Sequence, residues 1–117
     1  MYRLPLLLFA IAAVAGLTMA VMHFKGKTPP RPVLAVLHGL FAASGLVVLL
    51  LAVIKAGFGD APGIALGLLL VAALGGFALL SSHLRGRALP SALVVGHGLL
   101  AVAGFLVLLC AEFVILT

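Results

Sequence analysis

Four long runs of apolar residues, separated by three short polar segments, dominate the pattern along the chain. The runs cover residues 4–24, 33–54, 62–83 and 90–115. A helix needs about 20 apolar residues to cross the hydrocarbon core of a bilayer, and each run is long enough. Because the polar segments are short, consecutive helices must run antiparallel. The pattern predicts an all-α membrane protein, a four-transmembrane-helix up-down bundle that forms one domain over residues 1–117.

Composition points to the same class of protein. Hydrophobic residues make up 66% of the chain and charged residues only 8%. A soluble domain of this size needs a charged surface, which seven Lys and Arg residues and two acids cannot supply, so an ordinary soluble enzyme is excluded. Cys110 is the only cysteine, which excludes a disulfide scaffold. The basic residues lie between the apolar runs, so the net charge of +5 favours a lipid bilayer, and not nucleic acid, as the partner.

Basic residues also predict the orientation in the membrane. Five of the seven lie in the first and third polar segments, namely Lys25, Lys27, Arg31, Arg85 and Arg87. By the positive-inside rule these two links are cytoplasmic and both termini lie outside, which we place in a bacterial inner membrane. The first run also fits a secretory signal peptide, with a cleavage site near Thr18, Met19 and Ala20.

The second half of the chain repeats the first at an offset of 59 to 60 residues. Residues 38–52 and 97–111 share nine identities in fifteen positions, and both segments begin with His-Gly-Leu. The segment from His23 to Lys27 matches that from His83 to Arg87, and Gly16 matches Gly76. The sequence therefore predicts a duplicated two-helix hairpin, with repeats over about 4–54 and 62–115. Two copies of an even number of spans are related by an axis along the membrane normal. Cleavage of the first run would destroy one copy, which favours its retention.

All four histidines lie in or beside the apolar runs, and the repeat pairs His38 with His97 and His23 with His83. Ionisable groups inside a membrane are costly and usually functional. At 1.5 Å per residue, His38 and His97 lie roughly 9–10 Å below the cytoplasmic surface, at equal depth. His23 and His83 end their helices beside the basic links. The repeat therefore predicts two histidine pairs, one deep and one near the surface.

Small residues accompany the deep histidines in both repeats. Ala42 and Gly45 share the helix face of His38, and Ala101 and Gly104 share that of His97. Gly39 and Gly98 follow the two histidines directly. Such faces allow close helix packing, and they also leave room for a flat macrocycle held between two imidazoles. Cations beside the outer pair of histidines would reduce the cost of burying two propionates.

With these features the chain resembles the small transmembrane b-type cytochromes, whose four-helix bundles bind non-covalent haem through paired histidines. The resemblance implies haem b as cofactor, with His38 and His97 as axial ligands of the iron. It implies that His23 and His83 contact the propionates or ligate a second haem. It also implies electron transfer with a quinone or a redox protein, either alone or as an oxidoreductase subunit of a larger complex. One departure is that all four histidines belong to the cytoplasmic half, which argues against transfer across the whole bilayer by one haem.

Two other functions remain open from the sequence. Four histidines suit a transition-metal binding or transport protein, although His23 and His38 lie about two helical turns apart. Alternatively, the histidines pin helices together in a structural or assembly subunit. Small residues on outer helix faces also leave a homodimer open. A last expectation concerns Glu112 near the end of the fourth run, which we expect to pair with Lys55.

Overall fold

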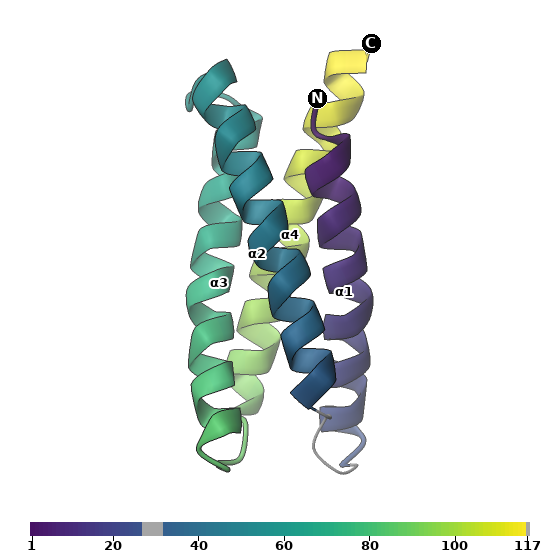
Figure 1. Cartoon of the computed structure of the whole chain (residues 1–117), viewed down its shortest axis with the longest axis vertical. Coiled ribbons are helices and arrows are strands. Elements are labelled where there is room, and N and C mark those ends of the chain that lie inside the picture. The colour runs from purple at the N-terminus through teal and green to yellow at the C-terminus, as the bar shows by residue number, and fades with distance from the viewer. Residues whose placement is uncertain (27–31, 117) are drawn as a thin grey trace.

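The computed structural model describes residues 1–26 and 32–116, with the side chains of residues 115 and 116 left aside. Four helices make up the described chain: α1 (Arg3–Phe24), α2 (Pro32–Ala56), α3 (Ala61–Leu84) and α4 (Ser91–Leu116). They run alternately up and down in a bundle 45 Å long (Figure 1). The predicted fold class is confirmed, and the four predicted spans agree with the helices to within two residues.

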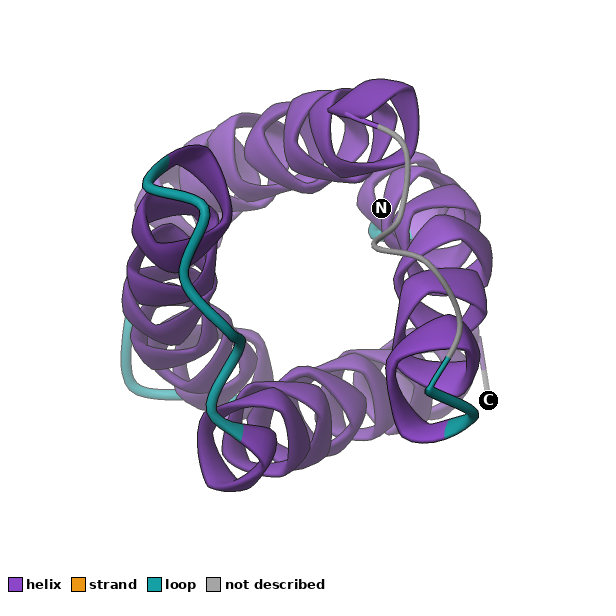
Figure 2. Cartoon of the chain, turned by 90° about the horizontal axis from the view of Figure 1, so that it is seen from below, coloured by secondary structure: helices purple, strands orange, loops and turns teal. Residues whose placement is uncertain are grey.

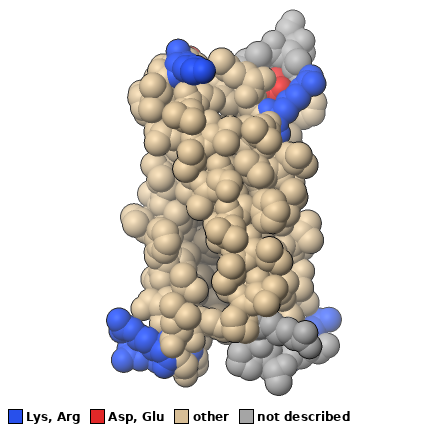
Figure 3. Space-filling model, in the orientation of Figure 1, with Lys and Arg blue, Asp and Glu red and all other residues tan. Residues whose placement is uncertain are grey.

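The length and apolar character of each helix suit a bilayer. All four helices are long and apolar enough to cross a membrane. A helix satisfies its own backbone hydrogen bonds, which a chain in lipid must do because no water is present to replace them. Apolar side chains remain exposed along the whole length of the bundle, whereas Lys and Arg gather at its two ends (Figure 3). The fold is therefore that of an integral membrane protein.

The repeated basic motif ends a helix in each half of the chain. Gly26 and Gly86 follow α1 and α3 with φ angles of +64° and +67°, values that glycine adopts without strain. Their backbone N–H groups donate to the carbonyls of His23 and His83, each at 3.2 Å. A glycine in this conformation is a common helix stop. The match between the two motifs is thus a match of helix ends as well as of charge.

Most contacts between helices lie within two hairpins, α1 with α2 and α3 with α4. The contacts between hairpins, α2 with α3 and α1 with α4, are fewer. Seen from below, the four helices surround the bundle axis as a ring (Figure 2). We call the end where α1 begins and α4 ends, together with residues 57–60, the terminal end. The end where α1 and α3 finish, with residues 25–26 and 85–90, is the link end.

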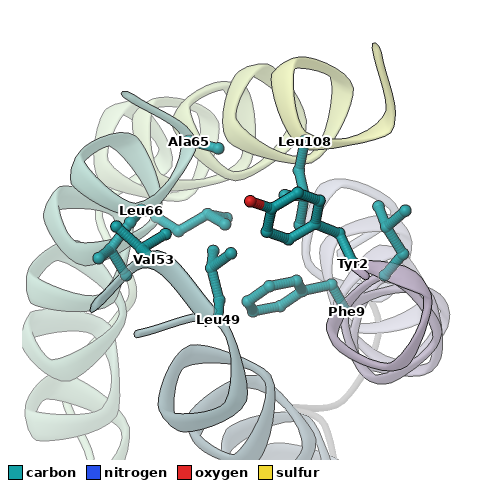
Figure 4. Close-up of a cluster of buried hydrophobic side chains, with 9 residues drawn as sticks. Tyr2, Phe9, Leu49, Val53, Ala65, Leu66 and Leu108 are labelled. Atoms are coloured by element: carbon teal, nitrogen blue, oxygen red, sulfur yellow. The ribbon is translucent and has the colours of Figure 1, made fainter. Parts of the chain in front are cut away.

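The hydrophobic core lies at the terminal end. Side chains from all four helices meet there, including Phe9, Leu49, Leu66 and Leu108 (Figure 4). Leu49 and Leu108 have no exposed surface at all. The buried residues nearest to the link end are related by the repeat: Ala12, Gly45, Ala72 and Gly104. Between these four and the links, no described residue is fully buried, so the link half of the bundle is loosely filled.

Candidate functional site

His38 on α2 and His97 on α4 face each other across the bundle axis, where the packed core ends. Their ring centroids are 5.9 Å apart and their ring planes meet at 79°. Both side chains are half-buried. These two helices lie diagonally opposite in the ring, and the repeat relates the two residues, so the structure places an imidazole pair close to the axis of internal symmetry.

The same hydrogen bond orients each ring. Nδ1 of His38 donates to the carbonyl of Ala12 at 2.8 Å, and Nδ1 of His97 donates to that of Ala72 at 2.6 Å. A carbonyl oxygen only accepts hydrogen bonds, so the proton of each neutral ring lies on Nδ1 and the Nε2 lone pair is available. Histidines that bind metal usually donate their other ring nitrogen to such a partner. The pair is therefore fixed in the tautomer that a metal ligand needs.

Two glycines on the neighbouring helices, Gly16 and Gly76, leave room for the imidazole rings. A Cβ atom added to Gly16 would lie 2.9 Å from Cε1 of His38, and one added to Gly76 would lie 3.0 Å from Cε1 of His97. Any side chain there would displace the ring. The repeat matches Gly16 to Gly76, and this pairing is the signal in the sequence for their shared role. The sequence of α1 and α3 does not show which helix face meets His38 or His97, so the two glycines were not predicted to belong to the histidine site.

The predicted small residues lie in different surroundings. A Cβ added to Gly45 would meet the ring of Phe9 at 2.7 Å, and one added to Gly104 would meet Cγ of Leu69 at the same distance. These two glycines therefore serve close packing beside the core. Gly39 and Gly98 have no atom within 4 Å of an added Cβ. The alanines of this set, Ala42 and Ala101, are half-buried.

The outer histidines differ from each other in their contacts. Nε2 of His23, on α1, lies 3.0 Å from Oγ of Ser91, on α4, and this hydrogen bond joins the two hairpins at the link end. His83 ends α3 and is half-buried, and the described residues offer it no hydrogen-bond partner. The position that corresponds to Ser91 in the first repeat is Pro32, which has no side-chain donor or acceptor. The repeat is thus exact in the deep pair and broken in the outer pair.

Basic residues surround the link end (Figure 3). Lys25, Arg85 and Arg87 are exposed there, directly after α1 and α3. Lys27 and Arg31, which belong to the same predicted set, lie outside the described residues. The link end therefore presents cations beside His23 and His83, as a site for acidic groups requires.

The donor set fits a haem. Two imidazoles on opposite sides of one iron, each bonded at about 2 Å, would have centroids roughly 6 Å apart. The observed separation is 5.9 Å. The link half, in which no described residue is fully buried, lies next to the pair. Figure 2 shows the four helices arranged around the axis on which the two histidines meet. By contrast, the described residues contain no group of three or more His, Cys, Asp and Glu side chains that could hold a metal ion on their own.

An apolar groove lies away from the histidines, between α1 and α2. Its volume is about 360 Å³ and its lining residues are Ile11, Val14, Ala15, Thr18, Leu34, Leu37 and Phe41. Val14 is 69% exposed and Leu37 is 42% exposed, which places the groove on the outer surface of the bundle. No charged residue or histidine lines it, so it has no group suited to binding a cofactor's metal.

A polar cluster closes the terminal end. Oε2 of Glu112 accepts a hydrogen bond from the backbone N–H of Tyr2 at 2.8 Å, and Oε1 accepts one from Nε of Arg3 at 3.3 Å. We expected Glu112 to pair with Lys55, but the structure pairs it with Arg3 on α1. The reason is that α1, and not α2, is the neighbour of α4 at this end. Burial, followed by the charges of Asp60 and Glu112, raises the pKa of Tyr2 above 10.0.

Comparison with protein-family models, with curated proteins and with solved structures found no match for this chain. The features of the chain that indicate a function are the geometry of the histidines and the half of the bundle that they face.

Proposed function

We propose that the chain is a membrane-embedded b-type haem protein that transfers electrons, with His38 and His97 as the two axial ligands of the iron. The observation that carries the proposal is the pair of matching hydrogen bonds from Nδ1 to the carbonyls of Ala12 and Ala72. They hold both rings with Nε2 available for a metal. The separation of the rings, 5.9 Å, suits one iron between them.

Two histidine ligands would limit the chemistry of the haem iron to electron transfer. Haem iron bound by two histidines accepts and donates one electron at a time, and it has no open coordination position. If His38 and His97 both bound the iron, oxygen would not bind directly to the metal. The apolar helices keep the site within the bilayer, where Gly16 and Gly76 leave room for the rings. The reaction class supported by this arrangement is outer-sphere electron transfer.

The link end would receive the acidic edge of the cofactor. His23 and His83 end their helices there, and Lys25, Arg85 and Arg87 follow them. Cations at this position lower the cost of placing two propionates near the membrane surface. This arrangement favours one haem over two, because His23 already bonds to Ser91.

The orientation that we propose puts the basic link end in the cytoplasm and both termini outside, in a bacterial inner membrane. Since the deep histidines lie in the link half, a single haem would exchange electrons near the cytoplasmic side. Its partners would be a quinone from the lipid or a redox protein at the link end.

The visible absorption spectrum of the purified protein in detergent tests the proposal, with haem quantified per chain. We expect a Soret band and a low-spin b-type α-band after reduction, with one haem per chain. His38→Ala and His97→Ala should each abolish the spectrum, because one pair acts as one site. Ser44→Ala, at an exposed position of α2, is the matched control and should keep the spectrum.

Hydrogen bonds from His38 and His97 to carbonyls would also serve a purely structural pair. That role predicts a folded and colourless protein even when haem supply is ample. It also predicts that the two alanine variants change stability alone. A protein that binds zinc, copper or iron without a Soret band would instead support metal transport. Either result would overturn the haem proposal.

A further inference from the structure

The two seams between the hairpins are not equivalent, although the repeat relates them. One seam lies between α1 and α4 and the other between α2 and α3. On α4, Ser91 bonds to His23 and Glu112 bonds to Arg3, and both partners belong to α1. Residues seven positions apart share a helix face, so the face of α4 toward α1 contains Ser91, Gly98, Phe105 and Glu112. The corresponding series on α2, toward α3, is Pro32, Gly39, Leu46 and Val53. The first seam has a polar contact at both ends, and the second series is apolar throughout.

At the terminal end, both seams between the hairpins are closed by a direct connection. Residues 57–60 join α2 to α3 covalently, and Glu112 bonds α4 to the start of α1. At the link end, residues 25–31 join α1 to α2, residues 85–90 join α3 to α4, and His23 bonds to Ser91 across the α1–α4 seam. The described residues provide no such tie between α2 and α3 there, because Pro32 stands where Ser91 stands in the other copy.

The surface of the molecule is hollowed at the same place. Figure 3 shows a hollow in the half nearer the links, on the side where α2 and α3 lie next to each other. An added Cβ at Gly39 of α2 would find nothing within 4 Å. In the link half of these two helices, Val36 of α2 and Leu84 of α3 are apolar and exposed at 56% and 75%. Molecules that reach this opening from the side must therefore be soluble in lipid.

We propose that the link-end part of the α2–α3 seam is a lateral gate through which a lipid-soluble quinol reaches the space beside His38 and His97. His83 lies in the last turn of α3, at the position that the repeat relates to His23, and has no hydrogen-bond partner among the described residues. Its imidazole can bond to a quinol hydroxyl or a quinone carbonyl. The choice of a quinol rests on the proposed electron transfer. One quinol would give up its two electrons one at a time, to the haems of two chains, and would become a quinone and release two protons to water.

Spin labels test the gate without any need for haem. Cysteines at Val33 and Leu84 report the α2–α3 seam, and cysteines at Ala92 and Phe24 report the α1–α4 seam at positions equivalent in the repeat. All four positions are exposed, and the exposed Cys110 is first replaced by serine. In lipid nanodiscs we expect a broader distance distribution for the α2–α3 pair, and a narrower one after ubiquinone is added. Equal widths, or a narrow α2–α3 distribution that ubiquinone leaves unchanged, would overturn the gate.

A second variant adds the missing tie. Pro32→Ser gives His83 the partner that Ser91 gives His23, and Pro32→Ala changes the backbone in the same way without the hydroxyl. We expect Pro32→Ser to slow haem reduction by duroquinol about fivefold relative to Pro32→Ala, the size of effect that one hydrogen bond produces. Reduction by dithionite should stay the same. Equal rates in both variants, or a matching loss with dithionite, would contradict the gate, whereas a protein without haem would contradict only the proposed function.

Discussion

The terminal half and the link half of this bundle consist of the same four helices, yet they are packed for different purposes. In the terminal half, Leu49 and Leu108 are fully buried and Glu112 bonds to the start of α1. In the link half no described residue is fully buried, and His38 and His97 face each other near the axis. The core thus holds the hairpins together at one end, which allows them to leave space between them at the other. Four predictions test this division, in order of decreasing effect.

The largest effect should follow from filling the space that the imidazoles occupy. Gly16→Ala and Gly76→Ala place a methyl group about 3 Å from the rings of His38 and His97, according to the added Cβ positions. We expect each to weaken haem binding about tenfold and the double variant about a hundredfold, which corresponds to about 2.7 kcal/mol. Haem titration followed at the Soret band measures this. Gly67→Ala, in the terminal half of α3, where the added Cβ also meets nothing, should bind haem as before. An equal loss in that variant would contradict the role of the two glycines.

Next in size is a cavity in the core. Leu49→Ala removes a side chain with no exposed surface, whereas Leu40→Ala, on the same helix in the link half, truncates one that is 61% exposed. We expect a loss of about 2 kcal/mol in the free energy of unfolding for Leu49→Ala, because lipid cannot fill the cavity, and little change for Leu40→Ala. Unfolding by SDS from mixed micelles gives both values. Similar losses would show that the two halves are packed alike.

Removal of the Glu112 carboxylate at the terminal end should lower the free energy of unfolding by less than Leu49→Ala does. Glu112→Ala leaves the backbone N–H of Tyr2 without its acceptor, and we expect a loss of about 1–2 kcal/mol in the free energy of unfolding. Arg3→Gln, at a side chain that is 76% exposed, should cost under about 1 kcal/mol. The same unfolding titration applies. If Arg3→Gln costs as much as Glu112→Ala, the exposed ion pair and not the buried hydrogen bond holds this end.

The smallest effect concerns alkaline pH. The pKa of Tyr2 is raised above 10.0 in the folded protein, so the unfolded chain loses this proton first as the pH rises. The contribution of Tyr2 to stability is therefore complete below pH 10 and is lost between pH 10 and the raised pKa. Tyr2→Phe should show a smaller fall in thermal stability from pH 9.5 to 11 than the unchanged protein. Parallel curves would show that this hydroxyl does not ionise in the transition.

The sequence was a good guide wherever a periodic or repeated pattern carried the information. Runs of about 20 apolar residues fixed the number of helices, because lipid leaves a chain few other ways to satisfy its backbone. The repeat related His38 to His97 and predicted that the two residues would lie at one depth. It also related the motifs around Gly26 and Gly86, which the structure shows to be equivalent helix ends.

The sequence did not predict which residues of different helices contact each other. We expected Lys55 to be the partner of Glu112, but that required knowing which helix lies beside α4 at the terminal end. Gly45 and Gly104 shared the histidine faces by spacing, yet Phe9 and Leu69 fill the space next to them. Periodicity defines which residues share a face, but not which face of another helix it meets.

The sequence by itself determined the membrane environment, the four helices, the duplication and the presence of paired histidines, since all of these follow from local hydrophobicity and from comparison of the chain with itself. Only the tertiary structure decided that the imidazoles lie 5.9 Å apart, that Ala12 and Ala72 orient them, and that one seam is tied by His23 and Ser91 while its counterpart is not. In lipid every helix face is apolar, so hydrophobicity no longer distinguishes inside from outside. The arrangement then depends on close packing and on a few hydrogen bonds between distant residues.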